Sequence, residues 1–479
     1  MKFHLRSASS VLLALPFIAT VTAQPVIDQH PVDQVVAIGG EAQFSVVASG
    51  TAPMSFQWRL GDIDLQGATQ PLLKVSNAQP NDEGSYTVEV TDASGSTLSD
   101  PAALTLDRNW VLYNPTNSGL PYKGVVDLEI DLEGNLWVAT GRWYAHEGGG
   151  VAQFDGQQWT VYTSTNSPLP DYDCTGSTLD ASGRIWVSTE LGLARYDAMH
   201  GWERLSRRQM WFPAFDLDGE LWLGSSSGLI RYDGVSWTGF QAANSALPND
   251  FVMCVVIDGE NRKWIGTNDG LAVFDDEDWT VYTASRDGLP GNAVGAIAID
   301  EEGTAWIGCI GRGMARFDGE NWTRYSSANS GLPGMSINWI LIDPNGVKWI
   351  ATEGGGLARF DGTNWQTYNQ SNSPLPDDYV QPLLLDRYGN LWIGMKEGGL
   401  AAFREGGVIM PLHMESLVAD GDGGAVLRWT GGLGPYQVQS RASLNAGDWE
   451  DHGPPTAEQS VSFDIGAASL FFRVRETQL

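Results

Sequence analysis

The chain has 479 residues, which is enough for two to four domains, and its formal net charge at pH 7 is -30. Such an acidic surface repels nucleic-acid phosphates and anionic lipid, which argues against nucleic-acid and membrane-surface roles. The three cysteines, Cys174, Cys254 and Cys309, have neither the number of a disulfide framework nor the spacing of metal ligands, so we expect small buried side chains.

Residues 1–23 have the pattern of a secretory signal peptide. Lys2 and Arg6 precede the apolar run VLLALPFIATV, and VTA before Gln24 is typical of a cleavage site. This run is too short to span a bilayer, and no other stretch reaches about 18 apolar residues. We therefore expect an exported protein, periplasmic or extracellular, with no membrane span and no covalent anchor.

Residues 24–106 predict a β-sandwich that resembles an immunoglobulin-like domain, in the runs EAQFSVVASG, MSFQWRL and NDEGSYTVEV. The resemblance implies that Trp58 is the core tryptophan and that Asp82 and Tyr86 form a tyrosine corner. Val46 and Val88 stand where the family usually has its inter-sheet cysteines, so we expect a cysteine-less, apolar core. Spacing or adhesion is the function that such a domain most often has.

Residues 107–409 consist of a repeat of about 42 residues. A tryptophan recurs in runs like GxLWIGT, an aspartate lies six residues before it, and a second tryptophan follows in runs like WTVYT. Each unit contains four strand-like runs separated by turns with Asp and Gly, which is typical of a β-propeller blade. The first tryptophans of the seven units are Trp137, Trp186, Trp222, Trp264, Trp306, Trp349 and Trp392.

The two ends of the repeat region complement each other. The seventh unit lacks its final tryptophan strand, and the first is preceded by an extra one, NWVLYNP at Asn109–Pro115. If Trp110–Tyr113 forms the outer strand of the last blade, the ring closes through main-chain hydrogen bonds and neither end blade is left incomplete. The sequence therefore predicts an all-β, seven-bladed propeller with N-terminal strand closure.

The units resemble the two-component regulator propeller repeat. That family supplies sensor ectodomains of hybrid histidine kinases and also occurs in free exported proteins. The resemblance implies extracellular recognition of glycans or other polymers. Because this sequence shows no kinase and no receiver region, we do not expect phosphotransfer.

Residues 410–479 contain the alternating runs AVLRWT, PYQVQSR, SVSFDI and LFFRVRE, separated by turn residues. They predict a small fibronectin-like β-sandwich at the C-terminal end.

An asymmetric ligand needs a feature that breaks the repeat, and two such features open on one face of the ring. Unit 1 carries the insertion TGRWYAHEGGG, and the connection to unit 3 is seven residues short, with SRRQMWFP in place of the NSxLP loop. Aromatic rings suit sugars, and arginines suit a carboxylate. Alternatively, the insertion packs across the gap with Trp211 as its core. The ligand-binding candidates are Arg142, Trp143, Tyr144, His146, Glu147, Arg207, Arg208 and Trp211.

Aspartates follow several of the NSxLP loops, where they would surround the mouth of the central channel. Clustered carboxylates can hold Ca²⁺, and solvated surface is the alternative. The candidates are Asp171, Asp173, Asp250, Asp377 and Asp378. We predict no cofactor.

The favoured function is non-enzymatic recognition of an extracellular glycan or another polymer. A propeller lyase that uses His146 and Glu147 is one alternative, because a lyase needs a general base. A pure protein–protein scaffold or adhesion protein is the other, and the oligomeric state stays open.

Overall fold

The computed structural model describes residues 23–141, 148–419, 424–441, 448–464 and 471–477. They form two compact units, one with residues up to Val36 and Glu41–Leu106, the other with Ala37–Gly40 and the chain from Asp107 onwards. The predicted signal peptide lies outside the described residues except for Ala23. In the described ranges the only helix is a single 3-10 turn at Pro80–Asp82, and no helix there is long and apolar enough to cross a membrane.

The first unit has an immunoglobulin-like core. Trp58 is fully buried, and the Tyr86 hydroxyl donates to the Asp82 carbonyl oxygen at 2.8 Å, which confirms the predicted tyrosine corner. Val46 and Val88 are both buried in this core, so an apolar pair replaces the usual disulfide. The strands are β1 (Val26–Gln29), β2 (Gln34–Ile38), β3 (Glu41–Ser45), β4 (Val47–Ser49), β5 (Ser55–Leu60), β6 (Ile63–Asp64), β7 (Leu72–Ser76), β8 (Gly84–Asp92), β9 (Gly95–Leu98) and the first part of β10 (Ala102–Tyr113).

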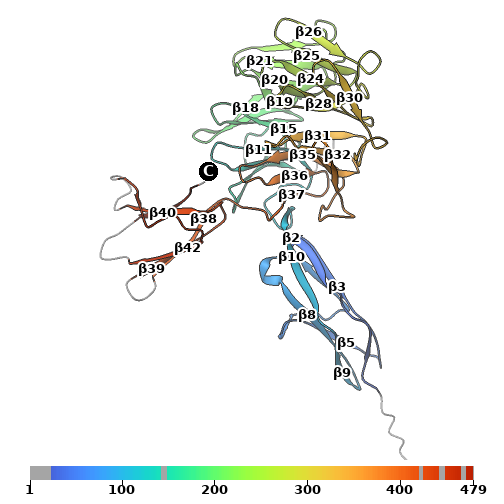
Figure 1. Ribbon diagram of the computed structural model, residues 1–479, viewed down its shortest axis with the longest axis vertical. Helices are drawn as coiled ribbons and strands as arrows, with labels where there is room; N and C mark the ends of the chain where they lie inside the picture. The colour runs from blue at the N-terminus through green and yellow to red at the C-terminus, as the bar shows by residue number, and fades with distance from the viewer. Residues whose placement is uncertain (1–22, 142–147, 420–423, 442–447, 465–470, 478–479) are drawn as a thin grey trace, which may run out of the picture. The chain divides into compact units, whose positions relative to one another are not determined.

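The second unit contains seven four-stranded antiparallel blades, which follow one another in chain order from β11 to β37 (Figure 1). Each innermost strand contacts that of the next blade, and β35 contacts β11, so the ring is closed. The strands of blades 1–3 are β11 (Val125–Ile130), β12 (Leu136–Thr140), β13 (Gly150–Phe154), β14 (Trp159–Tyr162), β15 (Cys174–Leu179), β16 (Ile185–Thr189), β17 (Gly192–Asp197), β18 (Gly201–Ser206), β19 (Trp211–Phe215), β20 (Leu221–Ser225), β21 (Gly228–Tyr232) and β22 (Trp237–Phe240).

The remaining blades repeat this pattern. Their strands are β23 (Val252–Ile257), β24 (Lys263–Thr267), β25 (Gly270–Phe274), β26 (Trp279–Tyr282), β27 (Val294–Ile299), β28 (Ala305–Cys309), β29 (Gly313–Phe317), β30 (Trp322–Tyr325), β31 (Ile337–Ile342), β32 (Lys348–Thr352), β33 (Gly356–Phe360), β34 (Trp365–Tyr368), β35 (Val380–Leu385), β36 (Leu391–Met395) and β37 (Leu400–Phe403).

Blade 7 is completed by the N-terminal strand, as predicted. Trp110–Tyr113 of β10 pairs antiparallel with Leu400–Phe403 of β37. Trp110 is buried, with its ring centroid 4.4 Å from that of Phe403. This pairing gives blade 7 its fourth strand, so neither end blade of the propeller is left incomplete.

The aspartate six residues before each first tryptophan has a structural role. In blade 4, Asp258 accepts the backbone N–H groups of Glu260 (3.0 Å) and Arg262 (2.9 Å) and the indole N–H of Trp264 (2.8 Å). One carboxylate thus closes the turn between the first two strands and fixes the tryptophan between blades. This explains the six-residue spacing.

The NSxLP loops are also structural connections. At Asn166, the side-chain oxygen accepts the N–H of Thr163 at 2.7 Å and the side-chain nitrogen donates to the Val161 carbonyl at 2.9 Å. Leu169 of the same loop is fully buried, and the equivalent leucines of the other five copies are buried as well.

The C-terminal region folds into two three-stranded sheets with a shared core. Trp429, Tyr436 and Val438 lie in this core and Val474 packs against them. The strands are β38 (His413–Ala419), β39 (Gly424–Thr430), β40 (Tyr436–Arg441), β41 (Glu450–Asp451), β42 (Ser460–Asp464) and β43 (Phe471–Glu476). Of the cysteines, Cys174 and Cys309 are buried and Cys254 is partly buried, and all three are free.

Candidate functional site

The insertion of blade 1 connects β12 to β13. Its candidates Arg142, Trp143, Tyr144, His146 and Glu147 lie outside the described residues. Its two ends are described, and both are glycines that approach the start of β15 in blade 2. A Cβ on Gly141 would lie 2.9 Å from the backbone nitrogen of Cys174, and a Cβ on Gly149 would collide with the carbonyl oxygen of Tyr172. Gly141 and Gly149, on either side of these candidates, therefore lie against blade 2.

From there a chain of contacts leads to the shortened connection. The backbone N–H of Glu190, in the loop after β16, donates to the Asp173 carbonyl oxygen at 3.0 Å. The Gln209 side-chain amide donates to the Glu190 carboxylate, next to the exposed Arg207 and Arg208. We call this region the blade 1–3 face: Gly141, Gly149, Asp173 and Glu190 are buried beneath it, and Arg207 and Arg208 are its exposed side chains.

Trp211 is not part of this surface, which corrects its assignment as a ligand-binding candidate. Its side chain is fully buried, and its indole N–H donates to the carbonyl oxygen of Val252 in the next blade. The ring covers Gly224, where a Cβ would lie 2.9 Å from it. Because the shortened connection lacks the buried leucine of the NSxLP loops, buried Met210 and Trp211 supply the apolar packing here.

The aspartate candidates do not form a metal site in the described residues, where no group of three or more His, Cys, Asp or Glu side chains is arranged to hold an ion. Asp250 accepts the N–H of Ala242 at 2.7 Å, and Asp378 accepts that of Gln370 at 2.8 Å, so both close connecting loops. Asp377 accepts two backbone N–H groups. Asp171 and Asp173 are buried. The carboxylates of Asp171, Asp250, Asp377 and Asp378 therefore accept backbone N–H groups.

A pair of acids, absent from the sequence-based candidates, lies on β11, the innermost strand of the blade that carries the insertion. Asp127 is 6% exposed, and its carboxylate accepts the N–H groups of Leu128 (2.9 Å) and of Ser177 on β15 (2.7 Å). Burial raises the pKa of Asp127 to about 7. Burial and the nearby Asp127 charge raise the pKa of Glu129 to about 8. Both groups are therefore largely protonated in mildly acidic solution.

This pair is specific to blade 1. The equivalent positions of the apolar blades are Cys254 and Val256, Ala296 and Ala298, Trp339 and Leu341, and Pro382 and Leu384. The innermost strand of blade 2 is polar too, with Thr175 and Ser177 buried. Aligning the innermost strands of the seven units by their turn aspartates would have found the pair from the sequence.

The second histidine of the propeller, His200, lies away from this surface. It is exposed in the turn between β17 and β18, with Nδ1 2.9 Å from an Asp197 carboxylate oxygen. Since that turn is on the opposite face of the blade, His200 cannot act with the acid pair as a general base.

The comparisons with known proteins agree with both units. The immunoglobulin I-set domain family matches residues 25–105. Endoglucanase C of Cellulomonas fimi is 35% identical over 92 residues, which are 18% of this chain and 8% of the endoglucanase.

Two solved structures show the fold. The extracellular domain of a hybrid two component system from B. thetaiotaomicron has a TM-score of 0.56 and 18% identity, over 87% of this chain and 63% of that one. A catalytically inactive virginiamycin B lyase from Staphylococcus aureus has a TM-score of 0.50 and 14% identity, over 61% of this chain and 98% of the lyase. The chain spans less than two thirds of the endoglucanase and of that extracellular domain. This protein thus carries an immunoglobulin I-set domain and a β-propeller with the fold of a two-component system's extracellular domain.

Proposed function

We propose that this protein is an exported, non-enzymatic recognition protein whose propeller binds an extracellular glycan or another polymer at the blade 1–3 face. The observation that carries the proposal is that the insertion, the shortened connection and the acid pair all fall in blades 1–3. Blades built from the same repeat offer the same surface, so a ligand without sevenfold symmetry must be recognised where the blades differ.

The chemistry of this face suits a hydroxyl-rich ligand. Exposed Arg207 and Arg208 can donate to a carboxylate or to hydroxyl groups, and the amide of Gln209 lies beside them. The insertion adds Trp143 and Tyr144, whose rings would stack on sugars. The extracellular sensor domain of the same fold supports a recognition role.

The lyase alternative is supported only by a likeness of fold and by His146 with Glu147 in the insertion. The scaffold alternative is supported by the I-set domain.

A glycan and polysaccharide binding array with the full chain tests the proposal. We expect binding that the Arg207→Ala, Arg208→Ala double variant and Trp143→Ala each weaken about tenfold or more, since charge-assisted and stacking contacts are lost. Arg312→Ala, on an exposed loop of blade 5, is the matched control and should bind as the wild type. Absence of any ligand would favour the scaffold, and ligand cleavage lost in His146→Ala would favour the lyase.

A further inference from the structure

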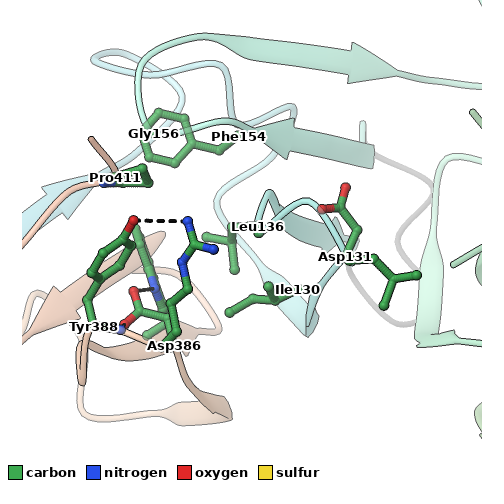
Figure 2. Close-up of a pocket in the computed structure, with 12 residues that line it drawn as sticks. Ile130, Asp131, Leu136, Phe154, Gly156, Asp386, Tyr388 and Pro411 are labelled. Carbon is green, nitrogen blue, oxygen red and sulfur yellow. Dashed lines mark hydrogen bonds between the residues drawn. The ribbon is translucent and has the colours of Figure 1, made fainter. Parts of the chain in front are cut away.

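A cavity of about 150 Å³ lies at the seam between blades 7 and 1, on the face opposite the NSxLP loops. Ile130, Leu136 and Phe154 of blade 1 and Tyr388 of blade 7 line it (Figure 2). Trp392 of blade 7 is also part of the lining. We call it the seam pocket. Apolar side chains form most of its walls, with a few polar groups among them, as in most small-molecule sites.

One positively charged side chain, that of Arg387, is part of the pocket lining. The Arg387 guanidinium donates to the Tyr388 hydroxyl at 3.0 Å, and its carbon lies 5.0 Å from the Tyr388 ring centroid (Figure 2). A Cβ on Gly134 would lie 3.3 Å from Arg387 Cζ, so the glycine leaves room for the guanidinium above the turn. Within the described residues Arg387 forms no ion pair.

The two carboxylates in the lining accept hydrogen bonds from donors other than this cation. Asp131 accepts the indole N–H of Trp137 at 2.8 Å and Asp386 accepts that of Trp392 at 2.9 Å, and each also accepts backbone N–H groups of its own turn. Both therefore have the structural role of the repeat. The exposed Arg387 is the cationic side chain of the lining, and a ligand there also meets the negative charges of Asp131 and Asp386.

The pocket is preformed by the chain that follows the propeller. The fully buried Asn390 side chain accepts the N–H of Ile409 at 2.9 Å and donates to the Ile409 carbonyl at 2.6 Å. This pair of bonds holds the segment that brings Pro411 to the pocket (Figure 2). A preformed site lowers the entropic cost of binding.

The basic and aromatic pair is specific to blade 7. The corresponding turn positions of the other six blades are Leu132 and Glu133, Ala181 and Ser182, Leu217 and Asp218, Gly259 and Glu260, Glu301 and Glu302, and Pro344 and Asn345. Since the turn folds with any of these pairs, Arg387 and Tyr388 are not required by the repeat.

We propose that the seam pocket binds a small aromatic monocarboxylate, with the ring against Phe154, Leu136 and Trp392 and the carboxylate on the Arg387 guanidinium. The pocket volume of about 150 Å³ matches that of a cavity that holds a benzene ring. The planar guanidinium fork matches a carboxylate in bidentate geometry. The site is separate from the blade 1–3 face.

Calorimetric titration of the full chain with benzoate tests this site, with benzamide as the uncharged analogue of the same shape. We expect saturable benzoate binding that is about tenfold or more weaker in Arg387→Gln, partly retained in Arg387→Lys, and about tenfold or more weaker for benzamide.

Arg312→Gln and Arg207→Ala are the controls and should bind benzoate as the wild type, the latter because it changes only the blade 1–3 face. Ile130→Phe, which enlarges a wall side chain, should weaken binding without removing the charge. Unsaturable benzoate uptake, or equal affinity in wild type and in a folded Arg387→Gln variant, would overturn the proposal.

Discussion

Asp127→Asn should change how the stability of the propeller depends on pH. The carboxyl has a pKa of about 7 in the folded protein against an ordinary value of 3.8. This difference corresponds to about 4 kcal/mol of preference for the protonated form. Between these two values the folded state binds a proton that the unfolded state has lost, so the free energy of unfolding falls as pH rises, by about 1.4 kcal/mol per pH unit. From pH 5 to 7 the wild type should lose about 2 kcal/mol through this group.

The asparagine cannot ionise, and its side-chain oxygen can accept only one of the two N–H groups that Asp127 binds on Leu128 and Ser177. We expect the variant to be less stable than the wild type at pH 5, by about 1–3 kcal/mol for the donor left unpaired. At pH 8 it should be as stable or more stable, because the wild type then holds a buried charge. The two stability curves should therefore cross.

The measurement is the urea unfolding midpoint of the propeller transition, followed by tryptophan fluorescence at pH 5, 6, 7 and 8 and constant ionic strength. Asp361→Asn is the matched control. Backbone N–H groups of Asn364 and Thr363 lower the pKa of Asp361 to about 2, so it stays ionised throughout this range and its replacement should shift the curve without changing its slope. Parallel curves for Asp127→Asn and wild type would refute the reasoning.

Three further predictions concern the packing of the propeller, each checked by the urea midpoint at pH 7. Asp258→Ala should lower the free energy of unfolding by about 2–4 kcal/mol, because two turn N–H groups and the buried Trp264 indole N–H lose their acceptor. Asp343→Ala is the control: the described bonds of the Asp343 carboxylate are to two backbone N–H groups only, so this variant should lose less stability. Asp276→Gly should relieve a left-handed φ of 78° yet destabilise, since fully buried Lys263 loses the carboxylate 2.7 Å from its Nζ and keeps only that of buried Asp216 at 3.4 Å. Adding Lys263→Met should restore only part of the stability, because Asp216 then loses its cation, and an additive double variant would contradict this coupling. Trp110→Ala should lower the free energy of unfolding by about 3–5 kcal/mol, because the buried ring leaves a cavity. Trp237, at the same repeat position in blade 3, is 37% exposed, so Trp237→Ala should lower it clearly less. Equal losses would argue against closure of the ring by β10.

The architecture could be predicted because it depends on spacings that are repeated seven times. The Asp and Trp positions fix a turn and a packed ring in every blade, and the unmatched strand at Trp110 predicts closure at blade 7. A single copy of such a pattern would be weak evidence for a blade, whereas seven copies at a regular spacing support the same assignment of strands and turns.

The site was harder to predict because its residues occur once. Trp211 was assigned to a ligand from its unusual neighbours, but the direction of its side chain depends on where β19 begins, and the strand begins at Trp211 itself. Phe212 has a φ of 50°, a local irregularity that composition does not reveal. Asp127 was not predicted as a buried residue. In sequence, an acid within an otherwise apolar strand looks like a solvent-facing residue of a strand that alternates apolar and polar side chains.

The closing strand also imposes an order of events in time. Asn109, beside the first residue of the closing pair, bonds Gly406, which lies 297 residues later in the chain. At about 5–20 residues per second, synthesis separates these two partners by roughly 15–60 s. Blade 7 is therefore the last to be completed, and the edges of β10 and β37 remain open to other strands until then. The seam pocket, which needs both blade 1 and blade 7, exists only after that step.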